Sequence, residues 1–173
     1  RGLYHLLVNN VKPPKKLMPA VYSTDRQSGC GQEAAEEKTE LIQKLERGEK
    51  IFVVELDPPF DANDTKLMDG ASLLRDIGVD MITLADSPLA RPRADSIASA
   101  IKMRYTRQME AMPHISCRDK NVIAHRAQLL GMHMNGLRHA LIVTGDPIAR
   151  GDRESIKSVF NFNSIKLMKY CLL

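Results

Sequence analysis

The sequence predicts an α/β protein with a parallel sheet, and three observations support this class. Short apolar runs rich in β-branched residues alternate four times with segments of helical periodicity. The runs are continuously apolar, which is typical of strands covered on both faces. Their starts lie roughly 30 residues apart, the length of one strand, one helix and two loops. The predicted strands are 51–56, 79–85, 111–117 and 139–145, and the helices that follow them are 64–78, 94–108, 121–136 and 163–173.

The beginning of the chain differs from these βα units. Residues 1–38 mix prolines, lysines and small polar residues without a sustained period, which predicts a linker or an extended arm. Good helix formers before Gly48 predict a further helix over 33–48. We therefore divide the chain into an N-terminal arm, 1–38, and the βα units, 39–173.

The number of units limits the architecture. A (β/α)8 barrel needs roughly 250 residues and a doubly wound sheet somewhat fewer. The chain of 173 residues has room for four units. If the parent fold is a barrel, these units are its first half. An open half-barrel would leave two apolar strand edges unpaired, so we expect the chain to self-associate as a homo-oligomer.

Composition argues against several classes of partner. The net charge is +4 from 25 basic and 21 acidic residues, and the basic ones are scattered, which does not favour nucleic-acid binding. No apolar run approaches the roughly 18 residues needed to cross a membrane, and the first residues lack the features of a signal peptide, so we expect a cytoplasmic protein. Three cysteines without CxxC spacing indicate neither a disulfide framework nor a metal site.

Polar and ionisable side chains follow every predicted strand. In parallel α/β folds the ligand lies at the carboxyl ends of the strands, where loops and helix N-termini meet. These ends therefore predict one shared ligand site. The stretches are Glu55 to Pro59, Ala85 to Pro88, His114 to Asp119 and Thr144 to Pro147.

Glu55 is the strongest single candidate among them. Glutamate is a poor strand former, and at the end of an apolar run it would lie partly desolvated, which raises a carboxyl pKa toward the range of a general acid. Asp57, Asp86 and Asp146 can also be turn residues beside proline. His114 is equally consistent with a core histidine and with a ligand contact.

Two further groups of residues are expected to be structural. Cys117 has no histidine at an informative spacing, so we interpret it as a packed thiol. Three histidines of the third helix and the loop after it are expected at the surface; they are His125, His133 and His139.

Three segments together resemble the methylenetetrahydrofolate reductases: VVELDPP at 53–59, the stretch from PHISCRD to VTGDP at 113–147, and VFNFNSIKLM at 159–168. The resemblance covers about residues 39 to 170. It is closest to the reductase half of bifunctional homocysteine methyltransferase/methylenetetrahydrofolate reductase proteins. Ala85, Asp86 and Thr144 also fit that branch better than the simple reductases.

The resemblance implies a (β/α)8 TIM barrel, of which this chain would hold the first four strands. It also implies FAD, which accepts electrons from a nicotinamide donor and passes a hydride to 5,10-methylenetetrahydrofolate, giving 5-methyltetrahydrofolate. A homocysteine methyltransferase domain would be a partner upstream.

The family's motifs imply a role for individual residues. Glu55 matches the glutamate of the E-x-x-P-P segment and would be the general acid. His114, in the P-H-x-[ST]-C stretch, would contact the flavin, and Asp146 would contact both flavin and folate. The other flavin contacts implied are Thr144, Gly145, Phe160 and Asn161.

Two alternative interpretations use the same features. One is a flavin-independent, pterin-dependent methyltransferase-like barrel that uses the strand-end carboxylates alone. The other is a non-catalytic, truncated α/β module that binds a partner through its open edges and its N-terminal arm.

Overall fold

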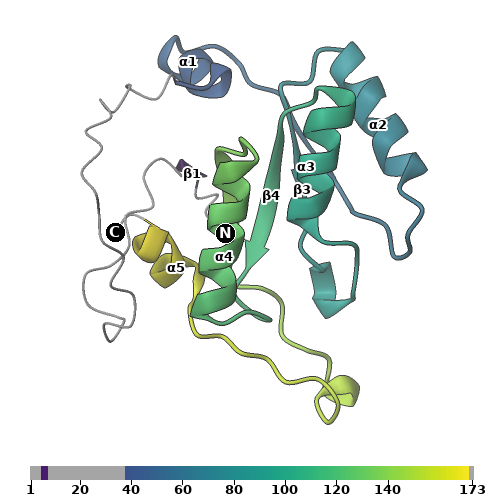
Figure 1. Cartoon of the computed structure of the whole chain (residues 1–173), viewed down its shortest axis with the longest axis vertical. Helices are drawn as coiled ribbons and strands as arrows, with labels where there is room; N and C mark the ends of the chain where they lie inside the picture. The colour runs from purple at the N-terminus through teal and green to yellow at the C-terminus, as the bar shows by residue number, and fades with distance from the viewer. Residues whose placement is uncertain (1–4, 8–37, 172–173) are drawn as a thin grey trace, which may run out of the picture.

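The computed structural model describes residues 5–7 and 38–171, and these form one five-stranded sheet with helices packed on it (Figure 1). The strand order is β1-β5-β4-β3-β2. The strands are β1 His5–Leu7, β2 Val53–Leu56, β3 Met81–Leu84, β4 Ala111–Ser116 and β5 His139–Val143. The helices are α1 Glu40–Glu46, α2 Thr65–Asp76, α3 Ser96–Arg107, α4 Val122–Met134 and α5 Ser164–Cys171, with short 3-10 helices η1 Pro88–Ala90 and η2 Arg150–Asp152.

Strands β2 to β5 are all parallel, which confirms the predicted class and the four repeated βα units. Each predicted strand and helix is present, but most are shorter at one or both ends. The ends are determined by capping groups. Asp95 and Asn121 begin α3 and α4, since each accepts a hydrogen bond from a backbone N–H three residues later. Gly78 and Gly136 follow α2 and α4 with positive φ, which ends both helices.

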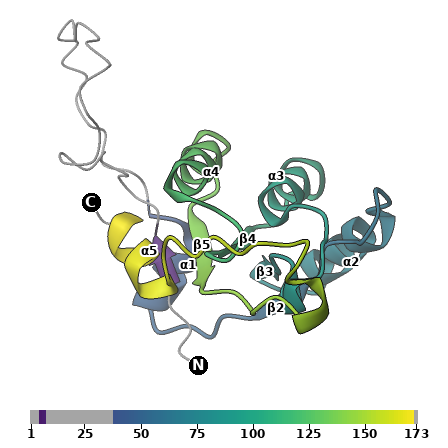
Figure 2. The same cartoon turned by 90° about the horizontal axis from the view of Figure 1, so that it is seen from below.

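The two faces of the sheet have different roles. Side chains alternate along each strand, so the register separates two sets. One set packs against α2, α3 and α4, and Figure 2 shows α3 and α4 on the same side of the strands; its strand members include Ile82, Leu84, Ala111, Ile115, Ala140 and Ile142. The other set includes Glu55 and Thr83, which pair in register, and His114. This second face is the one that a barrel would enclose.

The N-terminal arm was not expected to contribute a strand. β1 pairs antiparallel with β5, with His5 opposite Leu141 and Leu7 opposite His139. It therefore covers the edge of β5, so that among the described strands the two edges of the sheet are β2 and the three-residue β1, and β5 is not an edge. The rest of the predicted arm, and the first part of the helix predicted over 33–48, lie outside the described residues.

Over the described part of the chain, no helix combines the length and apolarity that crossing a membrane requires.

Candidate functional site

The carboxyl ends of β2 and β4 bring two of the predicted site residues together. His114 Nε2 lies 3.6 Å from Glu55 Oε2, although β3 runs between their strands. Glu55 pairs in register with Thr83, and Leu84 pairs with Pro113, the residue before His114. The parallel register therefore places Glu55 and His114 on the same face of the sheet, near the carboxyl ends of their strands.

The imidazole of His114 is a neutral group with a free nitrogen. Its side chain is 11% exposed, and burial lowers its pKa, against the opposing effect of the nearby Glu55, Asp86 and Asp57. Nε2 has no hydrogen-bond partner among the described residues. A buried polar atom of this kind is usually paired, so a ligand at this face would supply the missing partner.

Glu55 differs from its prediction in one respect. Its side chain is 62% exposed, so the expected partial desolvation is absent from the structure as described. The reason is topological. β2 is the edge strand of the sheet, and among the described elements no strand lies beyond it to shield the carboxylate.

Asp146 lies in the segment after β5 and contacts the loop after β3. Its Oδ2 accepts a hydrogen bond of 2.7 Å from the backbone N–H of Leu89. Within that loop Ser87, Leu89 and Ala90 all have positive φ, a conformation that residues other than glycine rarely adopt. The Asp146 carboxylate therefore makes a tertiary contact that stabilises a loop with an unusual backbone conformation. This role differs from the local turn role that the sequence also allowed.

The other two strand-end aspartates also make contacts between segments. Asp86 Oδ2 accepts from the backbone N–H of Ser116 at 3.0 Å and from Lys120 Nζ at 2.9 Å. Asp57 forms an ion pair of 3.1 Å with Arg93. Both aspartates fix loops around the site.

Gly145 and Thr144 are placed by close packing and by capping. Gly145 has φ +93°, and a Cβ there would lie 2.3 Å from Ser116 Oγ and 3.0 Å from Arg118 Cβ. A side chain at this position would overlap Ser116 and Arg118, so the close packing of the segment after β5 against β4 requires glycine. Thr144 Oγ1 accepts a hydrogen bond of 3.1 Å from the backbone N–H of Ser164, the first residue of α5. Its hydroxyl is thus engaged at the start of a helix.

Phe160 and Asn161 have structural contacts in this chain. Asn161 Oδ1 accepts from the backbone N–H of Val122 at 3.3 Å, at the start of α4. Phe160 has φ +41° and its ring is partly exposed. The described structure does not connect either residue to Glu55 or His114 through a hydrogen bond or an ion pair.

Two expectations about histidines are wrong, and one arginine within a predicted strand-end stretch was not singled out. His125 and His139 are buried, whereas only His133 is exposed as predicted. Arg118, at the end of β4, is 3% exposed and contacts three loops at the site. The only signal for Arg118 in the sequence is its position directly after a predicted strand. Many surface arginines occupy such a position.

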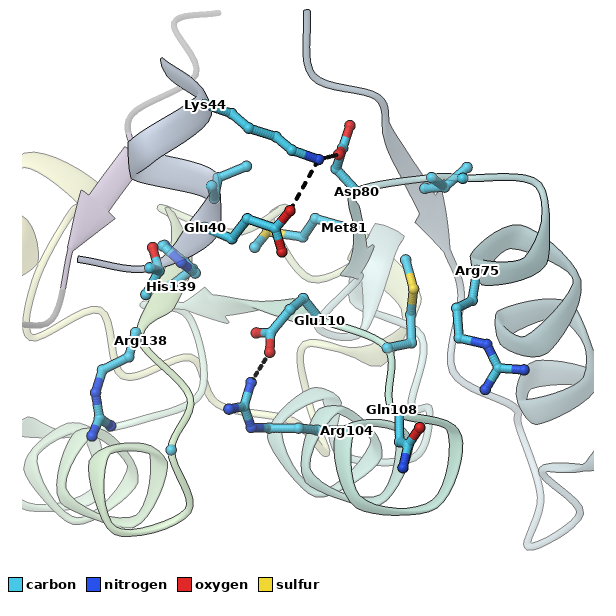
Figure 3. Close-up of a pocket in the computed structure, with 16 residues that line it drawn as sticks. Glu40, Lys44, Arg75, Asp80, Met81, Arg104, Gln108, Glu110, Arg138 and His139 are labelled. Atoms are coloured by element: carbon cyan, nitrogen blue, oxygen red, sulfur yellow. Dashed lines mark hydrogen bonds and ion pairs between the residues drawn. The ribbon is translucent and has the colours of Figure 1, made fainter. Parts of the chain in front are cut away.

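A hollow lies at the opposite end of the strands (Figure 3). It has a volume of about 430 Å³ and lies between α1 and the amino ends of β3, β4 and β5. Several of its charged groups are paired: Lys44 pairs with Asp80 at 2.5 Å and with Glu40 at 3.3 Å, and Arg104 pairs with Glu110. In parallel α/β folds this end serves stability. We therefore place the candidate site at the carboxyl ends.

The groups at the carboxyl ends suit an organic ligand better than a metal ion. Over the described residues, histidine, cysteine, aspartate and glutamate side chains do not gather in a set of three or more that could hold a metal. A free imidazole nitrogen, an exposed carboxylate and a fixed aspartate are groups that orient and protonate a ring system.

One family model matches most of the described chain. A model of the methylenetetrahydrofolate reductase family matches residues 40–171. A search of curated proteins found no significant match.

Proposed function

The chain belongs to the methylenetetrahydrofolate reductase family, and from this premise we propose that it carries the first part of a flavin-dependent site that reduces 5,10-methylenetetrahydrofolate to 5-methyltetrahydrofolate. Its four parallel βα units in one open sheet are those of a partial TIM barrel. The observation that carries the proposal is the pair of Glu55 and His114 at the carboxyl ends of the strands. A nicotinamide electron donor and an upstream homocysteine methyltransferase domain are parts of the same proposal.

The residues at the strand ends are compatible with FAD. His114 Nε2 is buried without a partner among the described residues and can bond to a ring heteroatom. Asp146 uses Oδ2 for Leu89, and Oδ1 can face a bound ring. FAD, when bound, would supply the hydride chemistry. By contrast, the side chains of Thr144 and Asn161 are engaged at helix starts, so we propose that these two residues support the site through the backbone around them.

We assign Glu55 the role of general acid. Protonation of a folate nitrogen by its carboxyl group would weaken the bond to the bridging methylene carbon. A general acid works best when its pKa is raised by a desolvated environment. Glu55 is exposed in the chain alone, so in this proposal the bound rings themselves exclude water from it. The neutral His114 beside it adds no positive charge that would favour ionisation of the carboxyl group.

The test separates the two half-reactions. Because the chain by itself is expected to be inactive, the test uses a protein that carries these four units within a complete barrel. That protein is titrated with FAD, and reduction by a nicotinamide donor and reoxidation by methylenetetrahydrofolate are followed by the visible absorbance of the flavin. We expect Glu55→Gln to slow reoxidation by about 10²- to 10⁴-fold, the usual contribution of a general acid, and to leave reduction unchanged. Asp57→Asn is the matched control, because it removes a carboxylate two residues away that is paired with Arg93.

Two outcomes would contradict the proposal. Equal loss of both half-reactions in Glu55→Gln would remove this residue from the acid role. A chain that binds folate but no FAD would favour the flavin-independent, pterin-dependent barrel.

A further inference from the structure

One buried arginine connects the loops that follow three neighbouring strands. Arg118 is the second residue after β4, and its guanidinium is 3% exposed. Nε and Nη2 donate to the two carboxylate oxygens of Asp119 at 2.8 and 2.7 Å, a bidentate pair that fixes the plane of the group. This pair within the loop of Arg118 orients the guanidinium toward its contacts in the other loops.

The remaining donors of Arg118 bind backbone carbonyls on either side. Nη2 donates to the carbonyl of Ser87, in the loop after β3, at 3.2 Å. Nη1 donates to the carbonyl of Asp146, after β5, at 3.4 Å. The carbonyl of Arg118 itself accepts from the backbone N–H of Val159 at 2.7 Å. Four separate segments therefore meet at this residue.

The two carbonyls that Arg118 binds belong to the two segments joined by the Leu89–Asp146 hydrogen bond. Ser87 and Leu89 both have positive φ, and such conformations persist only where the surroundings hold them. Arg118 fixes the loop at Ser87, and the carboxylate of Asp146 fixes it at Leu89. Arg118 also binds the backbone carbonyl of Asp146. One guanidinium therefore links the loop that contains Leu89 to the segment that contains Asp146.

We propose that Arg118 is a positioning residue that acts through Asp146: it holds the segments after β3 and β5 so that the Asp146 carboxylate keeps a fixed direction toward the ligand. The consequence for flavin binding depends on the proposed function, whereas the effect on the loop does not. Lysine cannot replace Arg118, because a single ammonium group cannot bind Asp119 through two nitrogens and also reach both carbonyls. The segment after β5 also lies close to this arginine, since a Cβ built on Gly145 would be 3.0 Å from Arg118 Cβ.

The first readout is amide hydrogen exchange of Leu89, which needs no cofactor. Arg118→Lys should lower the protection of this amide about tenfold or more, as should Asp146→Ala, which removes the acceptor directly. The amide of Ile115 in β4 should keep its protection in both variants. Arg104→Lys is the control, since it changes a guanidinium paired with Glu110 at the opposite end of the strands.

The second readout is a double-mutant cycle on the dissociation constant for FAD. In the complete barrel that carries these units, Arg118→Lys should weaken binding about tenfold and cause no further loss in the Asp146→Ala background, because residues that act through one another are not additive. Additive losses would overturn the proposal, as would unchanged protection of Leu89 in Arg118→Lys. If Arg118→Lys fails to fold, Asp119→Asn removes the bidentate partner and is judged by the same two results.

The two proposals fail in different ways. If the complete barrel that carries these units does not bind FAD, the proposed function is contradicted, and the exchange of Leu89 still decides the role of Arg118. If FAD binds and the cycle is additive, the proposed function stands and the positioning role is wrong.

Discussion

Gly145, two residues after β5, lies close against Ser116 of β4, and we expect Gly145→Ala to be strongly destabilising. The new Cβ would lie 2.3 Å from Ser116 Oγ, at a φ of +93° that alanine disfavours. Overpacking of this kind costs about 1–3 kcal/mol, and the backbone strain adds to it. The measurement is the free energy of unfolding in urea.

Gly131→Ala is the matched control for that prediction. Gly131 lies inside α4, and nothing lies within 4 Å of a Cβ built there. The same substitution should therefore stabilise the chain by about 0.5–1 kcal/mol through helix propensity. If both variants were equally stable, the close approach at Gly145 would be contradicted.

The thiols of Cys117 and Cys171 should be unreactive at neutral pH. Both are buried, and burial raises the pKa of each to about 11. The thiolate is the reactive form, so alkylation of the folded chain should be slower than in denaturant by several orders of magnitude. The rates are measured in a Cys30→Ser variant, because Cys30 lies outside the described residues. Rapid modification of Cys117 in the folded chain would reopen its interpretation as a nucleophile.

The site residues show where reasoning from the sequence succeeds and where it stops. Glu55 and His114 were predicted as site residues because the carboxyl ends of parallel strands always meet at one edge of a sheet. Their contact was not predictable, because it depends on the register of the strands between them. Arg118 lies in one of the predicted strand-end stretches but was not singled out, because its role consists of contacts with residues 28 and 31 positions away in the chain.

At the scale of elements, α4 contains a histidine that should make stability depend on pH. His125 is fully buried beside Phe162, with ring centroids 6.0 Å apart, and among the described residues neither ring nitrogen has a hydrogen-bond partner. Burial, assisted by Lys120, lowers its pKa below the usual 6.5. As the pH falls below 6.5, the unfolded chain binds a proton that the folded chain resists, so stability is lost on the acid side.

We therefore expect the free energy of unfolding to fall between pH 7.5 and 5.5, by at most about 1.4 kcal/mol per pH unit for each such histidine. His125→Leu should reduce this slope, and the remaining slope includes His114, whose pKa is lowered in the same direction. His133→Leu is the control, because His133 is an exposed histidine on the same helix. A slope that is identical in all three proteins would contradict the assignment.

The order of the elements was predictable, and their exact ends were not. Apolar runs and helical periodicity indicated each strand and helix from β2 to α5. The predicted helices over 64–78 and 121–136 extended past the observed ends at Asp76 and Met134. The helical spacing of apolar residues continues beyond these ends, although the turns at the following glycines are no longer helical. β1 has three residues and no pattern of its own, so only its pairing with β5 defines it.

At the scale of the whole molecule, the described sheet ends in β1 at one edge and in β2 at the other. β1 has three residues, and β2 has four and continues the parallel part of the sheet. Two apolar side chains are exposed at the start of β2: Phe52, just before the strand, and Val53 are 62% and 42% exposed. An unpaired apolar strand edge tends to pair with another chain. Self-association, which remains a prediction, should therefore proceed through β2.

The two edge strands determine how far this association can go. Two copies that meet through β2 form an isologous pair, which uses the β2 edge of each. The other edge strand, β1, has only three residues, and a very short edge strand offers little backbone for further pairing, so we expect association to stop at a dimer. We expect sedimentation equilibrium to show monomer and dimer in a concentration-dependent balance, and Phe52→Lys to shift it toward monomer, because a charge on an edge strand opposes pairing. Deletion of residues 1–7 removes β1 and opens the edge of β5, so this variant should form species larger than a dimer. A native chain that is monomeric at all concentrations would contradict pairing through β2, and a deletion variant that stops at the dimer would show that β1 does not protect the sheet.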